Sequence, residues 1–172
     1  FFDTNISKMV DMLPSILIRN KITHIICLNE EIKFEIIKSI DQFTMFKSAF
    51  PQLGPYTKML RKHSSSKFVE NLGIPVPDTK RPHSIDDLKT INIDGKLVVK
   101  GDRGNSSLNV RYANNRKELI QFYKEISGIE ADSDYVASPP IIQEYIGGPT
   151  YLSQAIADKG KVKVVIPHRK IR

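Results

Sequence analysis

Apolar residues near the start of the chain recur every three or four positions: Ile6, Met9, Val10, Leu13 and Leu17. This spacing predicts a helix, and Pro14 predicts that the helix breaks or restarts there. An isoleucine-rich run at 22–28, bounded by polar residues, predicts a buried strand. Asn29 suits a helix N-cap, and Glu30 and Glu31 follow it where the helix dipole favours carboxylates. Helix, buried strand and helix together indicate an α/β layer with a parallel strand.

Residues 48–56 contain Pro51, Gly54 and Pro55, so we interpret them as a linker or domain boundary. A single helix is expected at 57–72, with four apolar side chains in its core face: Leu60, Phe68, Val69 and Leu72. Gly73 should end that helix in the left-handed conformation. The two prolines at 75 and 77 then require extended backbone.

The second half of the chain alternates short strands with one helix. Residues 96–100 and 108–113 predict two antiparallel strands around the loop at 101–107, and Asn114 or Asn115 should cap the helix that follows. Three more strands are expected at 140–146, 151–158 and 161–167. This order is that of an α+β unit distinct from the first fifty residues, so the chain is predicted to be α/β overall, with two modules.

Composition and charge narrow the class of protein. A lone Cys27 excludes a disulfide framework and suits a reducing compartment, so we expect a cytoplasmic protein. No apolar stretch approaches the roughly 18 residues of a membrane span. The net charge is +7, and residues 51–125 hold fourteen basic and eight acidic side chains. That surplus favours an anionic partner, a nucleotide or a nucleic acid, although a merely solvated basic surface explains it equally simply.

The loop at 101–107 is the sharpest chemical feature. Its glycines allow backbone N–H groups to approach an anion, its polar side chains add donors, and Lys100 and Arg103 supply positive charge. These properties suit a loop that covers a polyphosphate. A hairpin loop rich in Gly, Asn and Ser is also often only a turn, so the pattern by itself leaves both interpretations open.

Four pieces in order give a resemblance to the ATP-grasp superfamily, in particular to the large chain of carbamoyl-phosphate synthase. They are Lys62 ahead of Gly73-Ile74-Pro75-Val76-Pro77, the strand Leu97-Val98-Val99-Lys100, the loop and returning strand Gly104-Asn105-Ser106-Ser107-Leu108-Asn109-Val110, and the hinge strand Ile141-Ile142-Gln143-Glu144-Tyr145-Ile146-Gly147-Gly148. The resemblance covers roughly residues 55–170. It implies an ATP-grasp domain in residues 51–172, preceded in residues 1–50 by the end of a Rossmann-like module.

The resemblance also implies a site. Lys62 and Lys100 would approach the phosphates of ATP, and Gly104, Asn105, Ser106 and Ser107 would form a flap over them. Gln143, Glu144, Tyr145 and Ile146 would bind the adenine edge, largely through backbone groups of Glu144 and Ile146. A strand can bind adenine in this way because it presents alternating C=O and N–H groups.

The implied reaction is activation of a small carboxylate as an acyl phosphate, followed by attack of an amine or ammonia, in a protein that admits a homodimer. Catalysis of this kind relies on positioning and on charge neutralisation by lysines and Mg²⁺. The family's metal ligands have no counterpart before Arg172, so we expect them beyond it and expect a fragment that is inactive alone. The alternatives are an inactive nucleotide-binding module and, ranked last because few aromatics accompany the basic residues, a nucleic-acid-binding domain.

Overall fold

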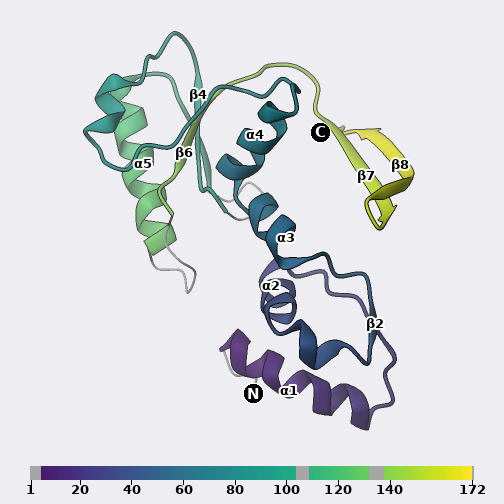
Figure 1. The fold of residues 1–172 in the computed structure, drawn as a ribbon. Helices are drawn as coiled ribbons and strands as arrows, with labels where there is room; N and C mark the ends of the chain where they lie inside the picture. Colours follow the sequence, from purple (N-terminus) through teal and green to yellow (C-terminus); the bar gives the residue numbers. More distant parts are fainter. Residues whose placement is uncertain (1–4, 104–108, 132–137, 172) are drawn as a thin grey trace. The chain divides into compact units, whose positions relative to one another are not determined.

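The computed structural model describes residues 5–103, 109–131 and 138–171, with the side chains of 129–131 left aside. The chain forms two compact units, residues 1–75 and 76–172. Figure 1 labels most of their helices and strands. This division does not decide where the predicted Rossmann-like module ends, so the module boundary at residue 50 stays a prediction.

The first unit contains four α-helices, a 3₁₀ helix and two short strands among its described residues: α1 (Ile6–Arg19), β1 (His24–Ile25), α2 (Glu30–Lys38), η1 (Ile40–Phe43), β2 (Lys47–Ser48), α3 (Leu53–Leu60) and α4 (Lys62–Asn71). Asn29 caps α2 as predicted, because its side-chain oxygen accepts from the N–H groups of Glu31 and Ile32. A buried cluster joins α1, α2 and η1, and it is made of Val10, Ile36, Phe43 and Phe46.

Helix α1 continues through Pro14, so the predicted break there is wrong. Leu13 and Leu17, on either side of the proline, both pack against the buried cluster of the first unit. Proline removes one intrahelical hydrogen bond, and packing on both sides of that position holds the helix together. The Asn5 side chain also caps the first turn by accepting from the Lys8 N–H.

The buried strand predicted at 22–28 is shorter and more exposed than expected. Only His24 and Ile25 form β1, which pairs in parallel with β2 in a two-stranded sheet. Ile26 and Leu28 are 86% and 89% exposed. The parallel pairing agrees with the prediction, but an apolar run is buried only where other elements cover it, and nothing in the described part of the chain covers these two side chains.

The single helix predicted at 57–72 is two helices, α3 and α4, separated by Arg61. Arg61 is extended, with φ −100° and ψ 124°. Phe68 and Leu72 are 45% and 61% exposed, so their assignment to a core is wrong. The periodicity of apolar residues indicates helical turns, but it does not locate a break of one residue between two helices. Gly73 does follow α4 with φ +75°, as predicted.

The second unit is built on a four-stranded sheet of order β3-β6-β4-β5. Its described elements are β3 (Thr79–Lys80), η2 (Asp87–Thr90), β4 (Leu97–Lys100), β5 (Val110–Ala113), α5 (Arg116–Ala131), β6 (Ile141–Glu144), β7 (Tyr151–Asp158) and β8 (Lys161–Arg169). Strands β4 and β5 are antiparallel neighbours, with Leu97 opposite Ala113 and Lys100 opposite Val110, which confirms the predicted pairing. Strand β6 lies antiparallel to β4 on its other side.

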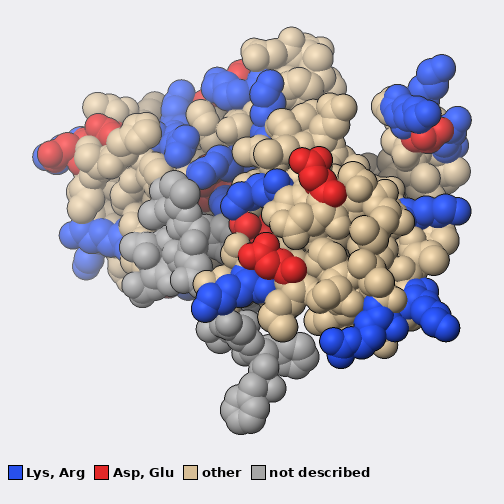
Figure 2. All heavy atoms as spheres, turned by 60° about the horizontal axis from the view of Figure 1, so that its bottom comes forward, with Lys and Arg blue, Asp and Glu red and all other residues tan. Residues whose placement is uncertain are grey.

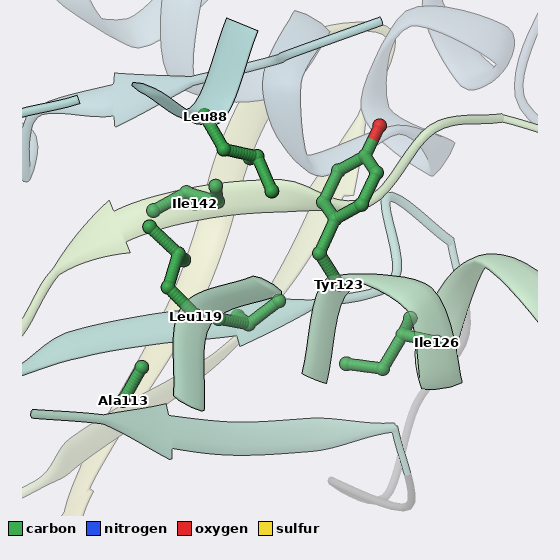
Figure 3. Close-up of a cluster of buried hydrophobic side chains, with 7 residues drawn as sticks. Leu88, Ala113, Leu119, Tyr123, Ile126 and Ile142 are labelled. Atoms are coloured by element: carbon green, nitrogen blue, oxygen red, sulfur yellow. The ribbon is translucent and has the colours of Figure 1, made fainter. Parts of the chain in front are cut away.

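The core of the second unit lies between one face of this sheet and α5 with η2 (Figure 3). Its buried members are Leu88, Val99, Ala113, Leu119, Tyr123, Ile126 and Ile142. Tyr123 brings a hydroxyl into this core, and that hydroxyl donates to the carbonyl oxygen of Pro82 at 2.9 Å. Packing of α5 against the sheet therefore leaves the opposite face of β4 and β6 for other contacts.

Two carboxylates hold the starts of η2 and α5. Asp87 accepts from the backbone N–H groups of His83 and Ser84, and the Ser84 hydroxyl accepts from the Asp87 N–H, which completes a capping box. These bonds lower the pKa of Asp87, and the bond from the His83 N–H has the largest effect. Glu118 accepts from the Asn114 N–H, and this bond lowers the pKa of Glu118. The Asn115 side chain caps α5 by accepting from the Glu118 N–H.

Strands β7 and β8 form an antiparallel hairpin at the predicted positions. Lys159 and Gly160 form its turn, with φ +47° and +78°. Positive φ at both central residues is the requirement of the two-residue turn that matches the twist of a hairpin. Every residue of the two strands is exposed.

Candidate functional site

Lys100 ends β4 on the sheet face that α5 does not cover. Directly opposite residues of an antiparallel pair share a face, so Val99 with Ile142 faces the core, while Lys100 with Ile141 and Val98 with Gln143 face the other way. The Lys100 ammonium donates to Oε1 of Gln143 at 2.8 Å. The last residue of this apolar strand, the lysine predicted to contact phosphate, therefore lies on the face that α5 leaves uncovered.

Gln143 connects this lysine to the edge strand β3. Its amide Nε2 donates to the hydroxyl of Thr79 at 2.7 Å, and that hydroxyl donates to the carbonyl oxygen of Pro77 at 2.8 Å. Thr79 lies opposite Gln143 in the β3–β6 register. A continuous row of hydrogen bonds therefore crosses three strands from β3 to β4.

A second polar group lies where the chain leaves β4. Asp102 is fully buried and accepts from the Ser138 hydroxyl at 2.9 Å, and that hydroxyl accepts from Nη2 of Arg81 at 3.0 Å. The buried Nε of Arg81 has no hydrogen-bond partner among the described residues. A buried carboxylate needs such partners, so this group ties the start of the 101–107 loop to the segment before β6. Sequence reasoning missed it, because the partners are far apart in the chain and no local motif marks them.

The segment that leaves β6 is held on both sides. The Glu144 N–H donates to the Asp78 carbonyl oxygen at 3.0 Å, and the Tyr145 N–H donates to the Lys96 carbonyl oxygen at 3.2 Å. Ile146, the next residue, is 62% exposed. The backbone donors of Glu144 and Tyr145 are thus engaged by the residues that immediately precede β3 and β4.

Three side chains cluster beside this segment. The rings of Tyr112 and Tyr145 meet edge to face with centroids 5.8 Å apart. The Lys96 ammonium lies 5.0 Å from the Tyr145 centroid and 6.0 Å from that of Tyr112, within cation–π range. Lys96 therefore contacts Tyr145 through both its carbonyl oxygen and its ammonium, which fixes the direction in which the chain leaves β6.

The predicted roles of Lys62 and of residues 104–107 are not tested by the described structure. Lys62 is the half-buried first residue of α4 and belongs to the first unit, whereas Lys100 and the hinge strand belong to the second. Gly104, Asn105, Ser106 and Ser107 lie outside the described residues. Their predicted roles at the phosphates stay predictions.

A cavity of about 960 Å³ borders the sheet on its other face. Leu97, Ile142 and Glu144 line it, and all three share the face opposite to Lys100 by register. The segment around η2 closes its other side, through Asp87, Thr90, Ile91 and Asn92. The cavity also reaches Gln143 and Tyr145, but it does not lie over the Lys100–Gln143 contact.

Basic side chains of the described residues lie beside acidic ones at several places. Figure 2 shows Lys and Arg side chains dispersed among acidic and neutral ones on the described part of the visible face. Several basic residues of the second unit pair with nearby carboxylates: Lys80 with Asp78, Lys89 with Asp86 and Arg111 with Glu125.

No group of three or more His, Cys, Asp or Glu side chains that could hold a metal ion occurs among the described residues. Within the same residues no helix is long and apolar enough to cross a membrane.

Comparison with known proteins gives two curated relatives. The chain is 30% identical over 118 residues to the succinate–CoA ligase (ADP-forming) subunit beta of Methanocaldococcus jannaschii, which covers 62% of this chain and 31% of that protein. It is 31% identical over 99 residues to the carbamoyl phosphate synthase large chain of Pyrococcus furiosus, covering 56% of this chain and 9% of that protein. The chain thus spans less than a third of the length of either relative. No protein-family model matches the sequence.

The fold is similar to that of solved ligase structures. Biotin carboxylase of Campylobacter jejuni, solved as a complex with βγ-ATP, superimposes with a TM-score of 0.75 at 16% identity, over 92% of this chain and 36% of that one. The sequence relatives and this structure are ATP-grasp enzymes. The chain therefore resembles the ATP-grasp superfamily in sequence and has its α/β fold, as the four motifs predicted.

Proposed function

We propose that this chain is the ATP-binding portion of an ATP-dependent ligase that joins a carboxylate to an amine or ammonia through an acyl phosphate. One observation carries the proposal: the Lys100 ammonium lies 2.8 Å from the side chain of Gln143, the residue that precedes the segment 144–146. A cation close to a backbone segment with hydrogen-bonding groups suits the two ends of ATP, its phosphates and its adenine. The name of one relative, an ADP-forming ligase, and that of the solved structure, a complex with βγ-ATP, support an adenine nucleotide as the ligand.

At the phosphate end, Lys100 supplies the charge. Lys100 is half-buried and follows the apolar residues Leu97–Val99, so its ammonium has lost part of its hydration. A polyphosphate within reach gains a charge-assisted hydrogen bond from it, worth on the order of 1.5–3 kcal/mol. Lys62 and the 104–107 loop are proposed, from the sequence alone, to contact the same phosphates.

At the adenine end, the backbone after β6 supplies the hydrogen bonds. The Glu144 N–H already donates to Asp78, so the Glu144 carbonyl oxygen is the group proposed to accept from the adenine amino group. The Ile146 N–H is proposed to donate to the adjacent ring nitrogen. An acceptor and a donor two residues apart, at the end of β6 and just beyond it, match the complementary pair on the adenine edge.

The proposed reaction has two steps. The carboxylate oxygen attacks the γ-phosphorus of ATP, which gives an acyl phosphate and ADP; the amine nitrogen then attacks the carbonyl carbon and phosphate leaves. Mg²⁺ bound to ATP would neutralise charge on the phosphates. Lys100 would act by orienting the phosphates and by neutralising charge on them.

Three finer parts of the proposal rest on the sequence resemblance. Residues 1–50 would be the end of a Rossmann-like module and 51–172 the first part of the ATP-grasp domain. The partners would be ATP and a small carboxylate. The lone Cys27, and not the resemblance, is the basis for proposing a cytoplasmic location. Light scattering of the full-length protein tests whether it forms the homodimer that the proposal admits. The nucleophile that attacks the acyl phosphate is the least constrained part of the proposal, because the two relatives bear the names of a CoA ligase and a carbamoyl phosphate synthase.

Trapping of the intermediate tests the proposed reaction most specifically. The full-length natural protein is incubated with ATP, Mg²⁺ and a panel of small carboxylates, and hydroxylamine is added to convert any acyl phosphate to a hydroxamate. We expect hydroxamate and ADP in equal amounts with one class of carboxylate. ADP release that is independent of every carboxylate, with no hydroxamate, would contradict the ligase proposal.

A further inference from the structure

The hydrogen bonds around Gln143 have a defined polarity. The Thr79 hydroxyl has a single proton, and it donates this proton to the Pro77 carbonyl oxygen at 2.8 Å. Toward Gln143 the same hydroxyl acts as an acceptor, and it receives the Nε2–H at 2.7 Å. The amide of Gln143 is thereby oriented with its nitrogen toward β3 and its oxygen toward β4.

That orientation determines what Lys100 meets. The Gln143 Oε1 accepts from the Lys100 ammonium at 2.8 Å, whereas a flipped amide would present two N–H donors to a cation. Gln143 is half-buried between Thr79 and Val98, its register partners, so the packing of the sheet also restricts its position. The backbone carbonyl of Pro77 at one end thus orients, through Thr79, the amide oxygen that Lys100 meets at the other.

We propose that Gln143 is a positioning residue for the phosphate-binding lysine, held in its working orientation by Thr79, and is not a contact to the adenine edge. The inference rests on the proposed function, because it assumes that Lys100 binds phosphate. It changes the role of Gln143, which the sequence resemblance placed among the adenine-binding residues. A neutral amide serves here because it orients the ammonium without neutralising the charge that a phosphate needs.

The expected effect follows from the cost of ordering a long side chain. Without the Gln143 acceptor, the Lys100 side chain loses one of the contacts that order it, so binding must immobilise it further. Immobilising such a side chain costs about 0.5–1.5 kcal/mol, which corresponds to about a 2- to 13-fold loss of affinity. The loss should concern ligands with phosphates and leave adenosine unaffected.

Four variants of the full-length natural protein separate these roles: Gln143→Met, Thr79→Val, Thr79→Ser and Gln143→Met combined with Lys100→Met. Affinities for a non-hydrolysable ATP analogue and for adenosine are measured by competition with a fluorescent ATP analogue, and thermal unfolding confirms that each variant is folded. We expect Gln143→Met and Thr79→Val to weaken the ATP analogue about 2- to 13-fold with adenosine unchanged. Thr79→Ser, which keeps the hydroxyl, should bind as the wild type does.

The combined variant gives the decisive comparison. If Gln143 acts through Lys100, adding Gln143→Met to Lys100→Met causes no further loss. An equal loss for adenosine, an additive loss in the combined variant, or unchanged affinity in Gln143→Met would overturn the positioning role while nucleotide binding still stands. A wild-type protein that binds neither ligand would overturn the proposed function as well, and this outcome is distinct from the others.

Discussion

Lys100 and Gln143 meet across neighbouring antiparallel strands, although 43 residues separate them in the chain, and the lysine ammonium donates to the glutamine amide oxygen at 2.8 Å. The pair is diagonal in the β4–β6 register, because Lys100 lies opposite Ile141 and Gln143 lies two residues further along β6. Side chains on the same face at such a diagonal remain within reach when they are long. The contact thus follows from the register and from the length of both side chains.

The core between α5 and the sheet should dominate the stability of the second unit. Ile126 is fully buried, so Ile126→Ala removes packed methyl groups and is expected to cost about 2–5 kcal/mol of the free energy of unfolding. Ile171→Ala is the matched control, since Ile171 is 91% exposed, and it should change stability by less than about 0.5 kcal/mol. Urea denaturation of both variants measures the difference. Similar losses for the two would refute the assigned core.

The two capping carboxylates predict how stability depends on pH. The backbone N–H of His83 and the other donors lower the pKa of Asp87, and the Asn114 N–H does the same for Glu118. A lowered pKa means that the stabilisation is present above the ordinary carboxyl pKa of about 4 and is lost as the pH falls through the folded value. The advantage of wild type over Asp87→Asn and over Glu118→Gln should therefore shrink between pH 6 and pH 3. Denaturation curves across that range test this, and a pH-independent difference would count against the caps.

The proposed adenine contact can be tested through the backbone. Ile146→Pro removes the N–H that is proposed to donate to the base, while Ile146→Ala keeps it and tolerates the loss of a side chain that is 62% exposed. A net contribution of about 0.5–1.5 kcal/mol for one hydrogen bond predicts about a 2- to 13-fold loss of affinity for adenosine and ATP analogues in the proline variant. Calorimetry with both variants measures it. If alanine and proline reduce affinity alike, the Ile146 N–H is not the donor.

Much of the second unit could be predicted from the sequence, because its signals are local. The apolar run before Lys100, the polar loop after it and the returning strand define a hairpin within about twenty residues, and β7 and β8 flank a Lys159-Gly160 turn. In the first unit the apolar run at 22–28 is misleading, because burial depends on what covers a strand and not on its own composition.

The contacts of the candidate site could not be predicted in the same way. Lys100 and Gln143 were each candidates, but only the strand order and register show that they touch and that Thr79 completes the row. Asp102 and Ser138 are 36 residues apart, and neither carries a local motif that points to the other. Such contacts are set by tertiary structure, which apolar periodicity does not encode.

The central claim is that Lys100 binds the phosphates of ATP, and Lys100→Met tests it most directly. Methionine keeps an unbranched apolar stem and removes the charge, so folding should be preserved. Lys89→Met is the control, because Lys89 belongs to the same unit and its ion pair with Asp86 is exposed, with both side chains more than 70% accessible. Both variants of the full-length natural protein are titrated calorimetrically with a non-hydrolysable ATP analogue. A loss of about 1.5–3 kcal/mol predicts that Lys100→Met binds about 10- to 150-fold more weakly than wild type, with Lys89→Met unchanged; equal affinities for wild type and Lys100→Met would contradict the claim.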